Sequence, residues 1–129
     1  MTIQRLDGKE CTKFSDWTRK VKRLDSRKGF YATDIDLIWI SKWGAGSYFL
    51  IETKCKMAEV KSTQHNTYAK IARNCLKDKD FKGLVYLQFE NTGPEDGKIF
   101  WNSVEITTEQ LIEYLAFEKV PPKSVRFAK

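Results

Sequence analysis

Two apolar runs on either side of a short glycine-containing segment constrain the fold of this chain more than any other feature. The first run covers residues 35–40 and the second covers residues 48–55, and both are rich in Ile, Leu and aromatic side chains. Between them lies Lys-Trp-Gly-Ala-Gly-Ser, residues 42–47, whose two glycines suit a turn. The pattern predicts a β-hairpin.

Hydrophobic periodicity predicts three helices and two further strands around this hairpin. Apolar residues spaced three and four apart form stripes that are typical of helices packed on one side. Before the hairpin, a helix is predicted across Phe14, Trp17, Val21 and Leu24, with Thr12 or Ser15 as its cap. After the hairpin come a helix over 62–76 and strands over 83–89 and 98–106. A last helix is predicted to begin with the capping pair Thr107 and Gln110. The order α-β-β-α-β-β-α points to an α/β fold, a central mixed sheet flanked by helices.

We expect a single domain over residues 1–129, because the chain has the length of one domain and no Pro/Gly/Ser-rich linker divides it. No apolar run approaches the roughly 18 residues that span a bilayer, and the first residues lack the apolar stretch of a signal peptide. Cys11, Cys55 and Cys75 are odd in number and widely spaced, which suits free thiols in a reducing compartment. A cytoplasmic location without a membrane partner is therefore expected.

The charge of the chain favours a polyanionic partner. The formal net charge is +6, and residues 1–28 hold nine Lys and Arg against four Asp and Glu. An ordinary solvated surface is the alternative, and charge alone does not separate the two.

A cluster of charged residues is predicted at the open end of the hairpin. Side chains two residues apart share a face of a strand, so Asp34 and Asp36 lie together, as do Glu52 and Lys54. A turn centred on Gly44 places Asp36 opposite Glu52 and Asp34 opposite Lys54. The register could slip by two residues, but a slip of one would move both the acidic and the apolar residues to the wrong faces.

The opposition of two carboxylates suggests a metal site. Like charges directly across a sheet are destabilising, and a bound divalent cation removes the conflict. Mg²⁺ is typically held by one or two carboxylates together with substrate phosphate. Lys54 could orient an attacking water or stabilise charge on the phosphate. The alternative is a solvated strand end with Glu52 and Lys54 as a loose surface pair.

The segment IDLIWI…YFLIETK, followed by Gln64 and Tyr68 at the start of the next helix, resembles the PD-(D/E)XK nuclease superfamily. The last two residues are similar to the Gln-x-x-x-Tyr element of its RecB-like branch. They are one helical turn apart and can face the same site. The resemblance covers about residues 30–76. It implies that Gln64 and Tyr68 support the site and contact substrate.

The resemblance also implies roles on the hairpin. Asp36 and Glu52 match the metal-binding acids, the backbone carbonyl of Thr53 matches a further metal ligand, and Lys54 matches the catalytic lysine. Asp34 is the competitor of Asp36 as a ligand. We prefer Asp36 because it begins the apolar run, as the acid does in the RecB-like pattern.

Two further acids are open candidates. Many members of the superfamily carry a Glu on the first helix, which Glu10 would supply here, with Asp16 as an alternative. A solvated cap is the more expected role for either residue. The sequence also lacks the proline before the first acid and has Thr-Asp-Ile-Asp instead, a departure from the namesake motif.

On this basis we expect a restriction-endonuclease-like fold and a Mg²⁺-dependent deoxyribonuclease, with Mn²⁺ able to substitute. The resemblance implies DNA as partner and a role in recombination, repair or viral DNA processing, as in small stand-alone viral, phage or archaeal nucleases. Holliday junction resolvases and single-strand or exonuclease types are both compatible. A homodimer suits two-fold-symmetric cutting. The alternative is the same fold as a non-catalytic module that binds DNA or a protein.

Basic residues around these elements are candidates for DNA contact, since phosphate contacts give affinity without base specificity. They are Arg19, Lys20, Arg23, Arg27, Lys28, Lys56 and Lys61. For any one of them a solvent-facing role is the simpler interpretation. His65 is the sole histidine, which excludes a His-Asn-His nuclease. A surface position is expected for it, although its place beside Gln64 would allow contact with substrate.

Overall fold

The computed structural model describes residues 12–24, 26–29 and 34–123, which fall into two units divided before Asp34. The expectation of a single domain stays a prediction. No helix in the described part of the chain is long and apolar enough to cross a membrane.

The first unit contains helix α1 (Thr12–Lys20) and two 3₁₀ turns, η1 (Lys22–Leu24) and η2 (Ser26–Lys28). The predicted helix was too long, because the chain leaves α-helical geometry after Lys20 and the Leu24 N–H bonds to the Val21 carbonyl at 2.9 Å. Such tighter turns commonly follow the end of an α-helix. The proposed caps Thr12 and Ser15 were also wrong, since both lie inside α1.

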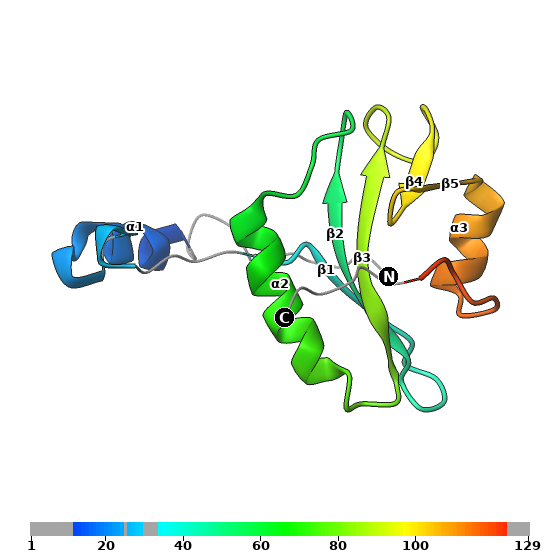
Figure 1. The fold of residues 1–129 in the computed structure, drawn as a ribbon, viewed down its shortest axis with the longest axis horizontal. Helices are drawn as coiled ribbons and strands as arrows, with labels where there is room; N and C mark the ends of the chain where they lie inside the picture. Colours follow the sequence, from blue (N-terminus) through cyan, green and yellow to red (C-terminus); the bar gives the residue numbers. More distant parts are fainter. Residues whose placement is uncertain (1–11, 25, 30–33, 124–129) are drawn as a thin grey trace. The chain divides into compact units, whose positions relative to one another are not determined.

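The second unit is an open, five-stranded mixed sheet with two helices (Figure 1). Its strands, in both chain and spatial order, are β1 (Leu37–Ile40), β2 (Tyr48–Lys54), β3 (Phe81–Phe89), β4 (Ile99–Trp101) and β5 (Val104–Ile106). Strands β2 and β3 are parallel, and the other neighbours are antiparallel. The mixed α/β class is therefore confirmed.

The hairpin of β1 and β2 has the predicted register. Leu37 pairs with Ile51 and Ile40 pairs with Tyr48, so the ladder leads toward Asp36 and Glu52 at its open end. The first strand is shorter than expected, because it begins at Leu37 rather than at Ile35. This shortening follows from the bonds of the Asp36 side chain, which are described with the site.

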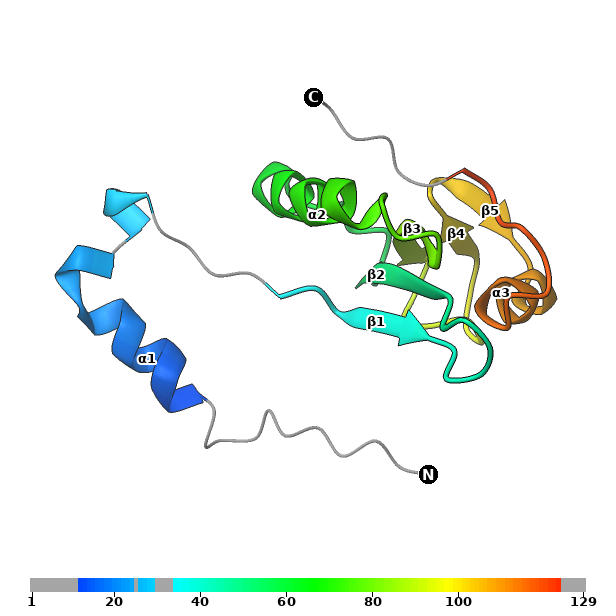
Figure 2. The same cartoon turned by 90° about the horizontal axis from the view of Figure 1, so that it is seen from below.

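Helix α2 (Ser62–Cys75) connects the parallel strands β2 and β3, as parallel neighbours require a crossover. Tyr68 and Ala72 on this helix are buried against Leu50 of β2 and Leu84 of β3. This cluster forms one core layer, and α2 lies along that face of the sheet (Figure 2).

Helix α3 (Thr108–Leu115) covers the other face. Its Leu111 and Tyr114 belong to a core cluster with sheet residues such as Phe49 and Trp101. Phe49 and Leu50 are neighbours on β2 and enter different clusters, as the alternation of side chains along a strand dictates. The molecule therefore has helices on both faces of its sheet.

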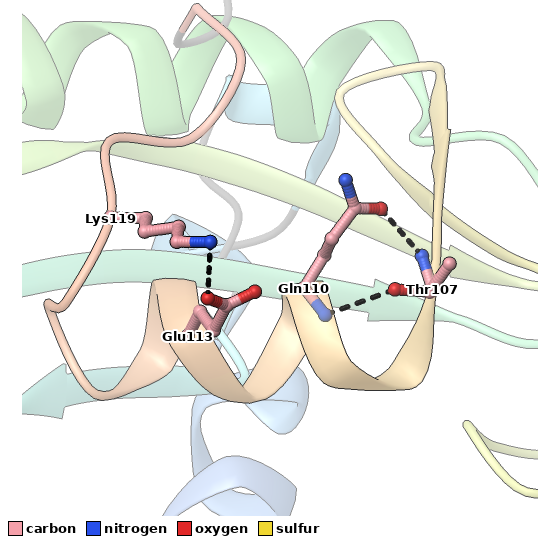
Figure 3. Close-up of polar contacts among 4 residues, drawn as sticks. All are labelled: Thr107, Gln110, Glu113 and Lys119. Atoms are coloured by element: carbon pink, nitrogen blue, oxygen red, sulfur yellow. Dashed lines mark hydrogen bonds and ion pairs between the residues drawn. The ribbon is translucent and has the colours of Figure 1, made fainter.

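Both ends of α3 are specified by local contacts. The Gln110 N–H donates to Thr107 Oγ1 at 3.1 Å and the Thr107 N–H donates to Gln110 Oε1 at 2.8 Å, which confirms the predicted capping box (Figure 3). At the other end, the N–H of the C-cap residue Ala116 donates to the Ile112 carbonyl at 2.8 Å. Glu113 in the last turn forms an ion pair with Lys119 at 2.6 Å.

Residues 98–106 were predicted as one strand, and this was wrong. The chain reverses at Asn102 and Ser103, whose φ angles of 48° and 69° are the left-handed pair of a type I′ hairpin turn. The Asn102 side chain also accepts a hydrogen bond from the Tyr86 N–H at 2.8 Å. The segment therefore makes strands β4 and β5, and the order gains one strand over the predicted one.

Candidate metal centre and catalytic site

Asp36 and Glu52 are brought together at the open end of the hairpin. The Asp36 N–H donates to Glu52 Oε1 at 3.3 Å. The Asp36 carboxylate in turn accepts the Thr53 N–H at 2.9 Å and the Thr53 hydroxyl at 2.8 Å, both on Oδ2. The Thr53 N–H thus donates to a side-chain oxygen instead of a backbone carbonyl of the neighbouring strand, and β1 begins only after Asp36.

Glu52 is the single charged residue buried in the described part of the chain, with 3 % of its surface exposed. The Tyr68 hydroxyl lies 2.6 Å from Glu52 Oε2 and also 2.6 Å from the carbonyl oxygen of Asp34. Each Glu52 oxygen thus accepts one hydrogen bond and keeps a further lone pair. Tyr68 is both a core residue, 1 % exposed, and a partner of the candidate ligand.

The two carboxyl groups have opposite pKa shifts. Burial raises the pKa of Glu52, and the neighbouring Asp36 raises it further, although the Tyr68 hydrogen bond and the Lys54 charge oppose the change. Partial burial disfavours the charged form of Asp36, but the hydrogen bonds from Thr53 outweigh it and lower its pKa. The pair therefore has one readily ionised acid beside one that resists ionisation, a conflict that a cation would relieve.

Lys54 is held at the same strand end by helix α2. Its Nζ lies 3.4 Å from Gln64 Oε1, and this oxygen also accepts the N–H of Lys61, the N-cap of α2, at 3.3 Å. Gln64 thus closes the start of the helix and connects it to the lysine. The charge of Lys54 lowers the pKa of both Asp36 and Glu52, so the ammonium belongs electrostatically to the site.

Tyr86 and His65 join this neighbourhood, and sequence reasoning did not place them there. Tyr86 on β3 is the register partner of Glu52, and its hydroxyl lies 2.6 Å from His65 Nδ1. Burial raises the pKa of Tyr86, with the charges of Tyr68 and Glu52 adding to the effect. His65 is half-buried, so it lies partly at the surface, as expected, while one edge of its ring meets Tyr86. The strand alternation of residues 83–89 could have indicated Tyr86, had the parallel pairing with β2 been recognised.

The other candidate acids have different contacts from those of Asp36. Asp34 is exposed and meets Tyr68 through its backbone carbonyl. Asp16 forms an exposed pair with Arg19 at 3.9 Å in the first unit. Glu10 lies outside the described residues. Of these acids and Asp36, it is Asp36 that the second unit brings against Glu52.

The basic candidates divide between the two units. Lys56 and Lys61 are exposed and follow Lys54 in sequence, after the end of β2. Lys56 has a positive φ of 54°, and its N–H donates to the Asn91 carbonyl at 2.8 Å. The remaining candidates, Arg19, Lys20, Arg23, Arg27 and Lys28, are exposed in the first unit.

The residues present fit a hard divalent cation. The observation that tests this is the buried Glu52 with a free lone pair on each oxygen, set beside an ionised Asp36. Among the described residues, no group of three or more His, Cys, Asp or Glu side chains gathers in one place. Two carboxylates nevertheless suffice for Mg²⁺ when substrate phosphate and water complete its shell, whereas a structural zinc site needs more nitrogen or sulfur ligands.

A comparison of the chain with models of known protein families, with curated proteins and with solved structures gives no match. The function of this chain is therefore inferred from its own residues and geometry, together with the resemblance carried by its motif.

Proposed function

We propose that this protein is a metal-dependent deoxyribonuclease of the PD-(D/E)XK type. The observation that carries the proposal is the contact between Asp36 and the buried Glu52, with Lys54 two residues further along the same strand. A buried carboxylate beside a second acid lowers the stability of the fold unless a cation balances the negative charge. We infer that the pair holds a cation for phosphodiester hydrolysis.

The fold supports this proposal at the level of architecture. The resemblance implies a mixed sheet flanked by helices, with the acids on a hairpin and the supporting Gln and Tyr on the following helix. In this chain the hairpin, α2 and the parallel strand β3 succeed one another in that way. We therefore propose that the second unit is a restriction-endonuclease-like core.

In the proposed reaction, water hydrolyses a DNA phosphodiester bond to a phosphomonoester and a free hydroxyl. Asp36, Glu52 and the Thr53 carbonyl would hold Mg²⁺, which when bound supplies charge stabilisation and lowers the pKa of coordinated water. Tyr68 fixes the Glu52 carboxylate through its hydroxyl. Lys54, held by Gln64, places positive charge where the phosphate becomes more negative.

DNA is the proposed partner, with Lys56, Lys61 and the basic residues of the first unit as phosphate contacts. Cutting two strands symmetrically would require two sites, which a homodimer supplies. Sedimentation of the free protein and of its complex with a DNA junction tests this part separately from catalysis.

The nuclease assay uses labelled linear, single-stranded, nicked and junction DNAs with Mg²⁺ or Mn²⁺. We expect the wild type to cut at least one of them and EDTA to stop the reaction. Asp36→Asn, Glu52→Gln and Lys54→Ala should each reduce kcat by at least about 100-fold, the range found when a group acting on the transition state is removed. Asp34→Asn is the matched control and should retain activity.

Two results would contradict the proposal. Wild-type activity in Glu52→Gln would remove the assigned ligand. DNA binding by a wild type that cuts none of the substrates would favour the alternative, a non-catalytic module on the same fold. A circular dichroism spectrum for each variant shows whether the fold survives the substitution.

A further inference from the structure

We infer that His65 is an additional substrate-binding residue that donates a hydrogen bond from Nε2 to a DNA backbone phosphate, and that Tyr86 positions its ring for this contact. The inference rests on the proposed function, since it names a further contact for the same substrate. It concerns two residues outside the motif of acids, lysine, Gln64 and Tyr68.

The first observation is the geometry of the pair. His65 lies in the first turns of α2, directly after Gln64, and its Nδ1 is 2.6 Å from the Tyr86 hydroxyl. The two rings also meet edge to face, with centroids 5.7 Å apart at an angle of 73°. A ring held by both a short hydrogen bond and an aromatic contact has little rotational freedom.

The second observation is which of the two groups, the Tyr86 hydroxyl or His65 Nδ1, donates the hydrogen between them. Within the described part of the chain, the bond to His65 is the one hydrogen bond of the Tyr86 hydroxyl. A protonated phenol needs an acceptor for its hydrogen, and unprotonated Nδ1 provides one. We assign the tautomer on this ground: when Nδ1 accepts the Tyr86 hydrogen, the ring hydrogen lies on Nε2, at the edge of the ring away from Tyr86.

The third observation is how firmly Tyr86 is itself held. Its backbone N–H donates to Asn102 Oδ1 at 2.8 Å, and its carbonyl accepts the Asn102 N–H at 3.0 Å. Its ring contacts that of Tyr68 at 6.5 Å between centroids, and in register it stands beside Glu52. Tyr86 thus ties the imidazole to the strand next to the candidate metal ligand.

The charges at the start of α2 favour an anion over a cation there, although Glu52 stands beside Tyr86 on the sheet. Lys54 meets the neighbouring Gln64, and Lys61 caps the helix one turn before His65. The first turn of α2 carries no acidic residue, so its positive end is not neutralised there. A backbone phosphate is the group of nucleic acid that this combination suits best.

Two substitutions of His65 separate the roles of its nitrogens. The amide oxygen of Asn can stand near the place of Nδ1 and still accept from Tyr86, whereas the amide nitrogen of Gln can stand near Nε2 and keep the donor. We expect His65→Asn to raise KM about five- to tenfold, the loss of one hydrogen bond, with kcat within twofold. His65→Gln should recover most of that loss. Asn66→Ala, at an exposed neighbour on α2, is the matched control.

A double-mutant cycle tests whether Tyr86 acts through His65. Tyr86→Phe should raise KM by a factor similar to His65→Asn, and the double variant should be no worse than either single variant. Additive losses would overturn the positioning role. An unchanged KM in His65→Asn would overturn the whole inference. The same would follow from a loss that depends on the base sequence of the oligonucleotide, because a phosphate contact weakens all sequences alike.

Failure of this inference is distinguishable from failure of the proposed function. If the wild type cuts DNA and His65→Asn has the wild-type KM, the nuclease assignment stands and the inference falls. If the wild type binds DNA without cutting, the assignment falls, and the Kd from fluorescence anisotropy replaces KM in the same cycle. A wild type that neither binds nor cuts DNA would overturn both.

Discussion

Tyr68 donates a hydrogen bond to Glu52 across 2.6 Å, with both side chains buried, and so joins helix α2 to the acid of strand β2. Tyr68→Phe keeps the ring but removes the hydroxyl, whose single hydrogen is shared between Glu52 and the Asp34 carbonyl. We expect a loss of about 1–3 kcal/mol in the free energy of unfolding, the usual cost of leaving buried acceptors unsatisfied. Urea denaturation without metal measures it, and an unchanged midpoint would contradict the contact.

The same substitution should weaken metal binding. Groups that orient a ligand typically contribute a factor of about 10–100 to metal affinity. We expect the Mn²⁺ dissociation constant of Tyr68→Phe to rise by that factor in isothermal titration calorimetry. Tyr114→Phe, on α3 in the core cluster of the other sheet face, is the control and should bind Mn²⁺ as the wild type does.

Glu52 should make the stability of the metal-free protein depend on pH. Its pKa is raised from an ordinary value near 4.5, so the folded state holds a proton that the unfolded state releases first. The contribution of Glu52 to stability should therefore be largest below about 4.5 and should be lost as the pH rises through the folded pKa. Glu52→Gln should lack this decline and exceed the wild type at pH 7, by roughly 0.2–1 kcal/mol if the cross-strand repulsion dominates. Thermal unfolding in EDTA from pH 4 to pH 8 shows whether the two curves diverge as described.

Asp96 should have the opposite dependence. It accepts hydrogen bonds from Thr92 and Gly93, which lower its pKa from an ordinary value near 3.8. Its contribution is present above that value and is lost as the pH falls through the folded pKa. Asp96→Asn should thus lower Tm at pH 7 and match the wild type near pH 2, whereas Glu95→Gln should have little effect at either pH. A constant difference between Asp96→Asn and wild type at all pH values would argue against this role.

At position 117, glycine should be less destabilising than alanine, the reverse of their usual effect on stability. It follows α3 with a φ of 58°, while its ring stacks on Phe49 at 5.1 Å. Both Phe117→Ala and Phe117→Gly lose the ring, at roughly 2–3 kcal/mol for a half-buried phenyl group. Phe117→Gly should nevertheless be the more stable of the two by about 1 kcal/mol, because glycine adopts the left-handed region without strain. Equal stability of the two variants would show that the backbone strain is negligible.

The hairpin was predictable because its register depends on local features. The glycines at 44 and 46 have positive φ, and a turn centred on Gly44 sets which residues of the two apolar strands face each other. The position of Asp36 beside Glu52 follows from that register. The capping pair Thr107 and Gln110 was equally local.

What the sequence could not provide were contacts that depend on pairing between distant segments. Tyr86 stands beside Glu52 because β3 runs parallel to β2, a relation that no local pattern encodes. The turn at Asn102 and Ser103 was missed because neither residue is a glycine, although Asn tolerates the left-handed region. The hydrogen bonds from the Thr53 N–H and hydroxyl to Asp36 were missed, because a threonine that ends a ladder resembles any other strand threonine in sequence.

The position of β1 at the edge of the sheet has a consequence for how the protein would lose function. The strand pairs with β2 alone, all four of its residues are exposed, and the Trp39 indole reaches the Leu115 carbonyl at 2.7 Å. Local opening of such a strand requires less free energy than global unfolding. Because Asp36 directly precedes β1, fraying there would separate the two acids while the core stays folded. Heat inactivation should thus precede the loss of helical signal.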